Sequence, residues 1–394
     1  MDPNPPTVGK GAIARRTITL PPLSQTTVSS APDIGTVDFS TKVECLEGKP
    51  IAVDRTMFWT GEGATSPGYH SSIGTTTPSK NWYLPEGSSA WGFETWTAVL
   101  NPNDSAANLT LRYMTETEGL KTINKTLPSN SRATYSMAAD IGTYDASIQV
   151  NSDIPVVAER SMYRNSRREG SCSVGSTTPY KTYFLAEGTT AWGFSTYVLV
   201  QNPNDDAATV TLTYMTPEGA REQPAFTLPA NSRHTIKVND VPGVESTDLS
   251  TQVSSDKPII AERSMYWDSS AGEAMHASIG LAEPHMSFYL PDGQTTNGWE
   301  TYTLVANPNP GSVTIEITYL PENGGTPVGF TDEIPPNSRR TYNMAGGGEA
   351  YPGIQGRASI LVRSLDGARP VMVERAMYWN NRCAGTDTIG GYGD

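Results

Sequence analysis

Cysteine and histidine are scarce in this chain of 394 residues, which contains three cysteines and four histidines. Cys45, Cys172 and Cys383 occupy non-equivalent positions, and the sequence has no CxxC pair. We therefore expect three free thiols, no intramolecular disulfide and no thiolate metal site. His70 and His276 precede similar segments and are expected to lie far apart, so the sequence predicts neither a metal site nor a cofactor.

A positive net charge and long apolar runs are also lacking. The formal net charge is −13, and an acidic surface repels phosphate backbones, which excludes nucleic acid as an expected partner. No run approaches the roughly 18 apolar residues that a membrane-spanning helix needs. The first residues lack the basic-then-apolar pattern of a secretory signal. The sequence thus predicts either a cytosolic chain or a processed portion of an exported one.

Catalytic motifs are missing as well, including GxSxG, the Walker loop and HExxH. Glu86, Glu187 and Asp292 recur at equivalent positions. Repeated carboxylates in copied surroundings have nothing to separate their pKa values, so we do not expect them to act as a catalytic acid and base. The segments 101–104 and 202–205 read first as turns and only second as calcium sites. We predict that the protein is not an enzyme.

Internal repetition is abundant. The segment 82–93 returns as 183–194 and, in altered form, within 288–299. The period of about 100 residues indicates stacked or circularly arranged copies of one unit. Each copy divides into a first half, called A-type, and a second half, called B-type. A further B-type half opens the chain, which gives the order B-A-B-A-B-A-B.

Both halves read as short β-branched and aromatic strands separated by turn residues, and no window keeps a helical period. We predict an all-β fold in which each half forms one four-stranded blade of a seven-bladed β-propeller. The alternative is a row of tandem immunoglobulin-like β-sandwiches, each made of an A-type and a B-type half. Residues 1–13 are predicted to be an N-terminal extension of the repeat domain 14–394. The predicted blades span 14–81, 82–130, 131–181, 182–230, 231–287, 288–336 and 337–394.

Several blocks resemble a tandem repeat of bacterial, actinobacterial-type surface and secreted proteins of unknown function. They read Trp-Tyr-Leu-Pro-Glu-Gly, Ala-Trp-Gly-Phe-Glu-Thr-Trp, Asn-Pro-Asn-Asp, Leu-Thr-Tyr-Met-Thr-Pro-Glu-Gly, Pro-Ala-Asn-Ser-Arg and Ala-Glu-Arg-Ser-Met-Tyr-Trp. The resemblance covers 82–394 fully and 14–81 in part. It implies export and a location outside the cell or on its surface.

Six tryptophans recur in the predicted loops and would gather on one face of a propeller. Amphipathic rings on loops suit stacking on a sugar or contact with a protein partner. The competing interpretation is that each ring fills the gap between neighbouring copies. The tryptophans are Trp91, Trp192, Trp299, Trp59, Trp267 and Trp379.

An acidic residue followed by an arginine also recurs in every B-type half. Adjacent strand residues face opposite ways, so each arginine shares a face with apolar neighbours. We expect ion pairs between copies, and a carboxylate-binding arginine cluster is the alternative. The pairs are Asp54 and Arg55, Glu159 and Arg160, Glu262 and Arg263, and Glu374 and Arg375.

Together these patterns predict a non-enzymatic, exported or cell-surface binding or adhesion module that presents aromatic loops to a glycan or a protein. The alternative is an architectural surface repeat or a filament-forming spacer, with self-association possible. A propeller-type hydrolase is a third and weaker interpretation, because no asymmetric set of catalytic residues is found.

Overall fold

The computed structural model describes residues 14–348 and 350–394, so the predicted extension 1–13 lies outside the described residues. The predicted all-β class is confirmed, because nearly all regular structure in the described residues is β-strand. The exceptions are the short helices α1 (Ala31–Ile34) and α2 (Met137–Ile141) and the 3-10 turn η1 (Val238–Asp240). None of the described helices is long and apolar enough to cross a membrane.

The strands form three complete units and one N-terminal hairpin. The hairpin consists of β1 (Asp54–Trp59) and β2 (Gly68–Ile73). The first unit comprises β3 (Ser79–Leu84), β4 (Glu94–Asn101), β5 (Ala107–Thr115), β6 (Leu120–Leu127), β7 (Ser131–Ser136), β8 (Ala146–Arg164) and β9 (Glu169–Val174). The second comprises β10 (Tyr180–Leu185), β11 (Phe194–Asn202), β12 (Ala208–Thr216), β13 (Gly219–Glu222), β14 (Phe226–Leu228), β15 (Ser232–Lys237), β16 (Ser250–Ser269) and β17 (Gly272–Ile279). The third comprises β18 (Ser287–Leu290), β19 (Trp299–Asn307), β20 (Val313–Pro321), β21 (Val328–Ile334), β22 (Ser338–Asn343), β23 (Ala358–Ser364), β24 (Met372–Trp379), β25 (Ala384–Ile389) and β26 (Gly391–Gly393).

Each unit is a sandwich of two antiparallel sheets. In the first unit the outer sheet has the order β6-β5-β8-β3 and the inner sheet the order β7-β4-β8-β9. The long strand β8 belongs to both, because its first part pairs with β5 and β3 and its second part with β4 and β9. Leu111, Ile148 and Val150 are fully buried between the two sheets. In the third unit the equivalent long strand is divided into β23 and β24.

The predicted four-stranded blades are therefore wrong, although the all-β class is right. Strands β3 and β4 both lie in one A-type half, yet β3 does not pair with β4, and each pairs with the B-type strand β8. The physical reason is burial. Strands such as β4 alternate buried and part-exposed residues, so each sheet needs a second sheet to cover its apolar face. The A-type and B-type halves cover each other, as in the sandwich alternative.

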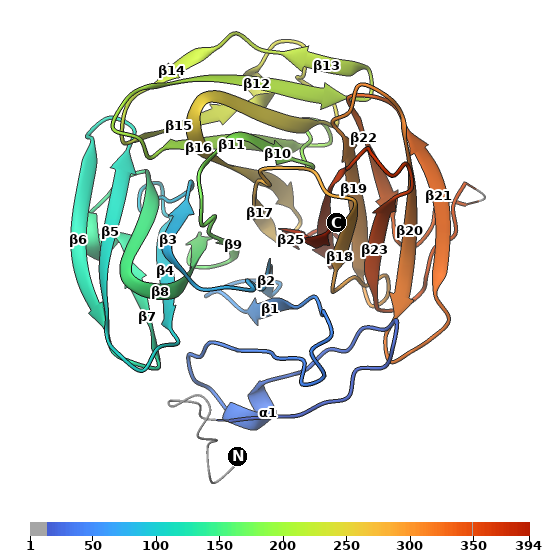
Figure 1. Ribbon diagram of the computed structural model, residues 1–394, viewed down its shortest axis with the longest axis horizontal. Coiled ribbons are helices and arrows are strands. Elements are labelled where there is room, and N and C mark those ends of the chain that lie inside the picture. The colour runs from blue at the N-terminus through green and yellow to red at the C-terminus, as the bar shows by residue number, and fades with distance from the viewer. Residues whose placement is uncertain (1–13, 349) are drawn as a thin grey trace.

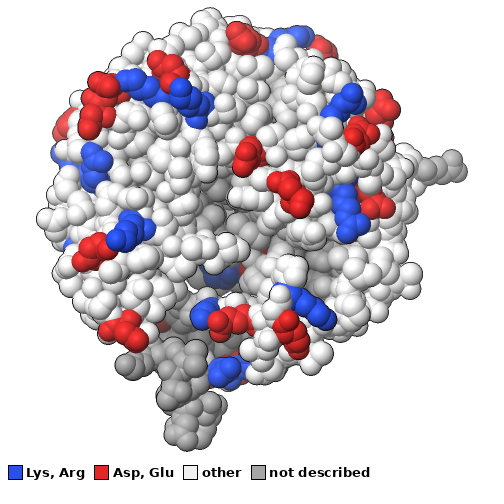
Figure 2. Space-filling view, in the orientation of Figure 1, with Lys and Arg blue, Asp and Glu red and all other residues white. Residues whose placement is uncertain are grey.

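The units form a closed ring instead of the rod that tandem sandwiches would give. Figure 1 shows the sandwiches around one axis, with β9, β17, β25 and β2 nearest to it. Along this ring β9 contacts β17, β17 contacts β25, β25 contacts β2, and β2 contacts β9. The N-terminal hairpin thus occupies a fourth position and closes the circle. Acidic and basic side chains are interspersed over the face in Figure 2, without a large area of one sign.

A buried asparagine fixes the turn after the second strand of each A-type half. The side-chain amide of Asn202 donates to the carbonyls of Asp206, Leu228 and Pro229 at 2.8–3.1 Å. Its Oδ1 accepts the backbone N–H of Asn204 at 3.0 Å. The equivalent Asn101 and Asn307 make the same contacts in their own units. The Asn-Pro-Asn pattern therefore records a turn in which a side chain ties two loops together.

We predict that Asn202→Ala lowers the free energy of unfolding by about 2–4 kcal/mol, because it leaves buried carbonyls without donors. Urea denaturation of the full chain measures this change. Thr209→Val, on the exposed face of the neighbouring strand, is the control and should change stability by less than about 0.5 kcal/mol. Equal effects of the two substitutions would contradict this account of the turn.

Candidate functional site

The recurring acid–arginine pairs meet at the seams between units. The arginines lie on β1, β8, β16 and β24, and each guanidinium reaches the acid of the following unit. Going round the ring, the bonded pairs are Arg160 with Glu262 at 2.8 Å, Arg263 with Glu374 at 3.0 Å, Arg375 with Asp54 at 2.8 Å, and Arg55 with Glu159. We call this circuit the ion-pair ring.

The carboxylates of the ion-pair ring are also held by backbone groups of the A-type loops. The N–H of Glu86 donates to Glu262 at 3.2 Å, and the N–H of Ala186 donates to Glu374 at 2.6 Å. Glu86 itself lies 3.5 Å from Arg160. Glu86 and its equivalents therefore cover the seams, and they pair with arginines instead of forming a catalytic dyad. Burial raises the pKa of Glu262, and the charge of Arg160 opposes this rise.

One seam carries an additional carboxylate. Asp387 of β25 is fully buried and lies 3.0 Å from Arg263, which already pairs with Glu374. The equivalent residue of β17 is Ala277, so the extra acid has no counterpart there. Burial raises the pKa of Asp387 well above its ordinary value of 3.8, and the adjacent carboxylate of Glu374 raises it further. Folding therefore favours the protonated form of Asp387.

The two equivalent histidines lie at different seams and serve as packing residues. His276 contacts Arg263 at 3.1 Å and the hydroxyl of Tyr378 at 3.3 Å. His70 contacts the hydroxyl of Tyr163 at 3.2 Å. Burial lowers the pKa of both imidazoles, and the nearby arginines lower it further. Among the described residues no group of three or more His, Cys, Asp or Glu side chains is placed to hold a metal ion.

The three cysteines are all free. Cys172 lies on β9 within 3.4 Å of the Arg55 guanidinium. Burial raises the pKa of Cys172 to about 12, although Arg55 and Arg160 act in the opposite direction. A thiol with a raised pKa is a poor nucleophile.

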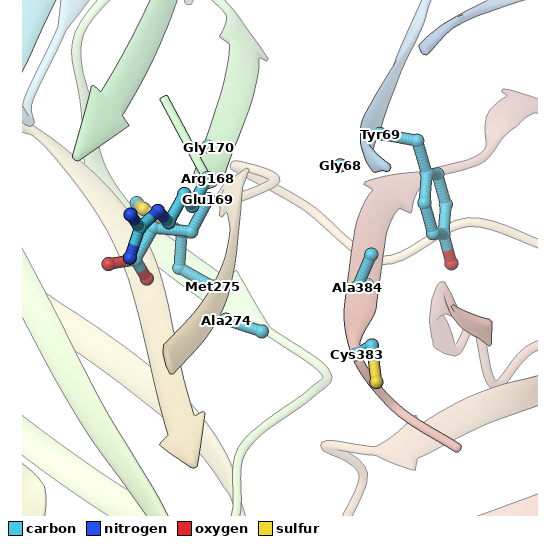
Figure 3. A pocket seen from close by; sticks show the side chains of 10 residues that line it. Gly68, Tyr69, Arg168, Glu169, Gly170, Ala274, Met275, Cys383 and Ala384 are labelled. Carbon is cyan, nitrogen blue, oxygen red and sulfur yellow. The ribbon is translucent and has the colours of Figure 1, made fainter. Parts of the chain in front are cut away.

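A narrow cavity follows the ring axis. Figure 3 shows the side chains around it, contributed by β2, β9, β17 and β25 and by the loops before β9 and β25. Tyr69, Glu169, Met275 and Ala384 are among them. Its volume is about 10 Å³, which is near the minimum for one water molecule. This cavity is therefore too small for a substrate.

The six predicted tryptophans divide into two exposed residues and four seam residues. Trp91 and Trp192 are 80% and 82% exposed, and they lie in the loops that lead from β3 to β4 and from β10 to β11. Both have a left-handed backbone, with φ of 55° and 59°. Because the units are related by rotation about one axis, equivalent loops lie on the same face of the ring. Trp91 also donates its indole N–H to Asp145 at 3.2 Å.

The sequence comparison that grouped Trp299 with Trp91 and Trp192 is wrong by two positions. The left-handed residue of the third unit is Asn297, with φ of 56°, and Trp299 corresponds to Phe93 and Phe194. Asparagine is the side chain most tolerant of this conformation after glycine. The correct alignment of the three loops can be found from the glycine that follows each left-handed residue. These glycines are Gly92, Gly193 and Gly298. Trp299 instead stacks on Trp379 at 5.8 Å between ring centroids.

The remaining tryptophans lie at the seams. Trp267 donates to the carbonyl of Arg382 in the third unit at 2.8 Å, and its ring lies against Gly385 of β25. Trp59 donates to the carbonyl of Arg167 in the first unit at 2.6 Å and lies close to Gly170 of β9. A side chain on either glycine would collide with the indole. These rings therefore join neighbouring units and are not displayed to solvent.

Comparisons with known proteins give little further information. No family model matches the chain, and no curated protein matches it. The solved Thermotoga maritima 1070 protein is 12% identical, covers 27% of this chain and 96% of its own length, and has a TM-score of 0.25. The Anabaena sensory rhodopsin transducer is 23% identical, with coverages of 21% and 93% and a TM-score of 0.19. Similarity at this level supports no conclusion about fold or function.

We predict that Arg160→Met lowers the free energy of unfolding by about 3–5 kcal/mol, because it leaves the buried Glu262 without its counter-charge. The double variant with Glu262→Gln should recover much of this loss. Arg167→Met is the control, since its pair with Glu94 is exposed, and it should cost no more than about 1 kcal/mol. Denaturant unfolding of the unmodified chain and these three variants measures the changes, and a double variant no more stable than Arg160→Met would contradict the assignment.

The raised pKa of Asp387 gives a prediction for pH. Folding favours its protonated form, so its contribution to stability is largest below pH 3.8 and is lost as the pH rises towards the folded-state pKa. Asp387→Asn removes this loss. The variant should therefore gain stability relative to the unmodified chain as the pH rises from 3.8 through neutrality. Thermal unfolding across this range measures the difference, and a difference independent of pH would refute the assignment.

Proposed function

We propose that the protein is a non-enzymatic binding module that presents Trp91 and Trp192 to a glycan outside the cell. The observation that carries this proposal is the state of the two rings. Each is largely exposed and left-handed, so neither adds to the core and both bear a backbone conformation that costs about 1–2 kcal/mol for an ordinary side chain. Strain of this kind at an exposed position suits a residue kept for binding.

The surroundings of the two rings favour a sugar. The equivalent acids Asp145 and Asp248 lie beside the loops, where they form isolated bridges with Ser88 and Thr189. An exposed indole can stack on the apolar face of a pyranose while carboxylate and hydroxyl groups accept or donate hydrogen bonds to its hydroxyls. The third unit has Asn297 and Arg357 at these positions, so the proposal concerns two sites on one face. Two equivalent sites also suit a repeating or branched ligand.

A role in binding without catalysis agrees with the use of the other polar groups. The recurring acids and arginines are occupied with one another at the seams, and the axial cavity is too small for a substrate. Location outside the cell rests on the resemblance of the repeat blocks to bacterial surface proteins. An architectural role as a spacer remains the competing function, and it predicts no glycan ligand.

The test is a glycan array followed by titration of any glycan bound. Trp91→Asn and Trp192→Asn introduce the residue that the third unit uses, so folding should be preserved or improved. Each should weaken binding at least about tenfold, because burying a large side chain against a ligand contributes about 1.5–3 kcal/mol. Asn297→Ala in the third unit is the matched control and should bind normally. Failure to bind any glycan, or full binding by the double variant, would overturn the proposal.

A further inference from the structure

The fourth position of the ring contains only a B-type hairpin among the described residues. Strand β1 pairs with β2 and with no other strand. In the complete units the equivalent strands β8, β16 and β24 lie between two neighbours, and the second neighbour is the A-type strand β4, β11 or β19. One edge of β1 therefore remains open, next to the surface seam with the first unit.

The direction of the backbone groups can be assigned. The N–H of Gly74 donates to the carbonyl of Val53 at 2.8 Å. Hydrogen-bonded pairs alternate along antiparallel strands, so the backbone N–H and C=O groups of Asp54, Thr56 and Phe58 point to the open edge. In the second unit the equivalent residues pair with β11 in this direction. The edge thus offers the same row of backbone hydrogen-bonding groups with which an A-type strand pairs elsewhere in the molecule.

Apolar residues at this position are retained but uncovered. Met57 is 37% exposed, whereas the equivalent Met162, Met265 and Met377 are 1%, 0% and 2% exposed. Ile51 is 40% exposed, whereas its three equivalents, Val156, Ile259 and Val371, are fully buried. In the other units Val156 is buried with the A-type residues Trp82 and Leu84. Met265 packs with the A-type residue Phe194 and with Leu304 and Tyr378 of the next unit. The fourth position is therefore suited to the same cover.

The charged groups at the fourth position are also less covered than their equivalents in the complete units. The side chain of Arg55 is 38% exposed, whereas those of Arg160, Arg263 and Arg375 are at most 1% exposed. From the other side of the seam, Arg233 and Arg339 each donate to a glycine carbonyl in the A-type loop of the preceding unit, at 2.9 Å and 2.6 Å.

Arg132 is the equivalent arginine of the first unit. It lacks such a loop and pairs instead with the exposed Asp38 at 3.2 Å. Both sides of the seam thus present the groups that an A-type loop would engage.

The N-terminal segment does not take the place of this cover. Apart from α1 it has no regular structure before β1, and Figure 1 shows it running round the rim of the ring. Gln25 contacts Pro321 and Asn323 in the third unit, and Thr27 accepts a hydrogen bond from Arg357. The segment therefore runs from the third unit to Arg132 of the first unit, and none of its described residues pairs with the edge of β1.

We infer that the open edge of β1 is an acceptor for an A-type half-repeat donated by another polypeptide. The donor would add its second strand beside β1, as β11 lies beside β16, and would cover Met57 and Ile51. Its Glu-Gly loop would bring a carbonyl to Arg132 and a backbone N–H to Glu159, as Glu86 does for Glu262. Strand addition to an exposed edge is a known mode of peptide recognition, in which backbone bonds give affinity and side-chain positions give specificity.

The experiment adds a synthetic peptide with the sequence 182–230 to the full chain and follows backbone amide exchange by NMR. We expect a one-to-one complex in which the amides of Asp54, Thr56 and Phe58 exchange at least about tenfold more slowly. A control peptide carrying Val198→Asp and Val200→Asp should give no protection, because both valines are fully buried against the B-type half in the second unit.

A variant of the chain provides a second readout. Arg132→Ala alters a surface residue and should leave the chain folded while weakening peptide binding severalfold. Three results would each overturn the inference. They are the absence of protection by the matched peptide, protection of the three amides in the free chain at low concentration, and protection that increases with chain concentration alone, which would identify a second copy as the occupant.

Discussion

The contact between each buried arginine and the acid of the next unit is the interaction on which the rest of the structure depends. The pairs join β8 to β16, β16 to β24, β24 to β1 and β1 to β8, and these strands pair with the strands β9, β17, β25 and β2 that meet around the axis. A buried charge without its partner costs several kcal/mol, so each unit stabilises the charged residues of its neighbour. The B-type hairpin at the N-terminus completes this circuit, with Asp54 and Arg55 bonded to different units.

The ion-pair ring also explains which polar residues are unavailable for chemistry. Glu86 and its equivalents cover the seams, and the histidines pack against arginines and tyrosines. The repeated pattern that suggests a catalytic or ligand-binding cluster in the sequence is satisfied internally. Trp91 and Trp192 are not part of this ring, and our proposal assigns binding to them because each has a left-handed backbone and a largely exposed side chain.

The incomplete fourth position follows from the same repetition. A B-type half has the same seam residues wherever it occurs in the chain. The N-terminal hairpin therefore closes the ring through β2. The edge of β1 that faces away from β2 still has the backbone groups and apolar side chains of a complete unit. Closure of the ring and the open edge are thus two consequences of one sequence pattern, and we propose that the open edge serves for contact with a partner.

The sequence by itself determined the local features. Period-2 alternation and turn residues specify strands such as β4 and β12, the repeat length specifies equivalent units, and the adjacent acid and arginine specify opposite faces of one strand. Alternation says only that one face is buried, however, and not which strand lies beside it or which sheet covers it. Pairing across the two halves and closure at four positions depend on contacts distant in sequence. Only the tertiary structure decided these, because a half-repeat can bury its apolar face in more than one way and the ring selects the one that also pairs Arg160, Arg263 and Arg375 with acids of the next unit.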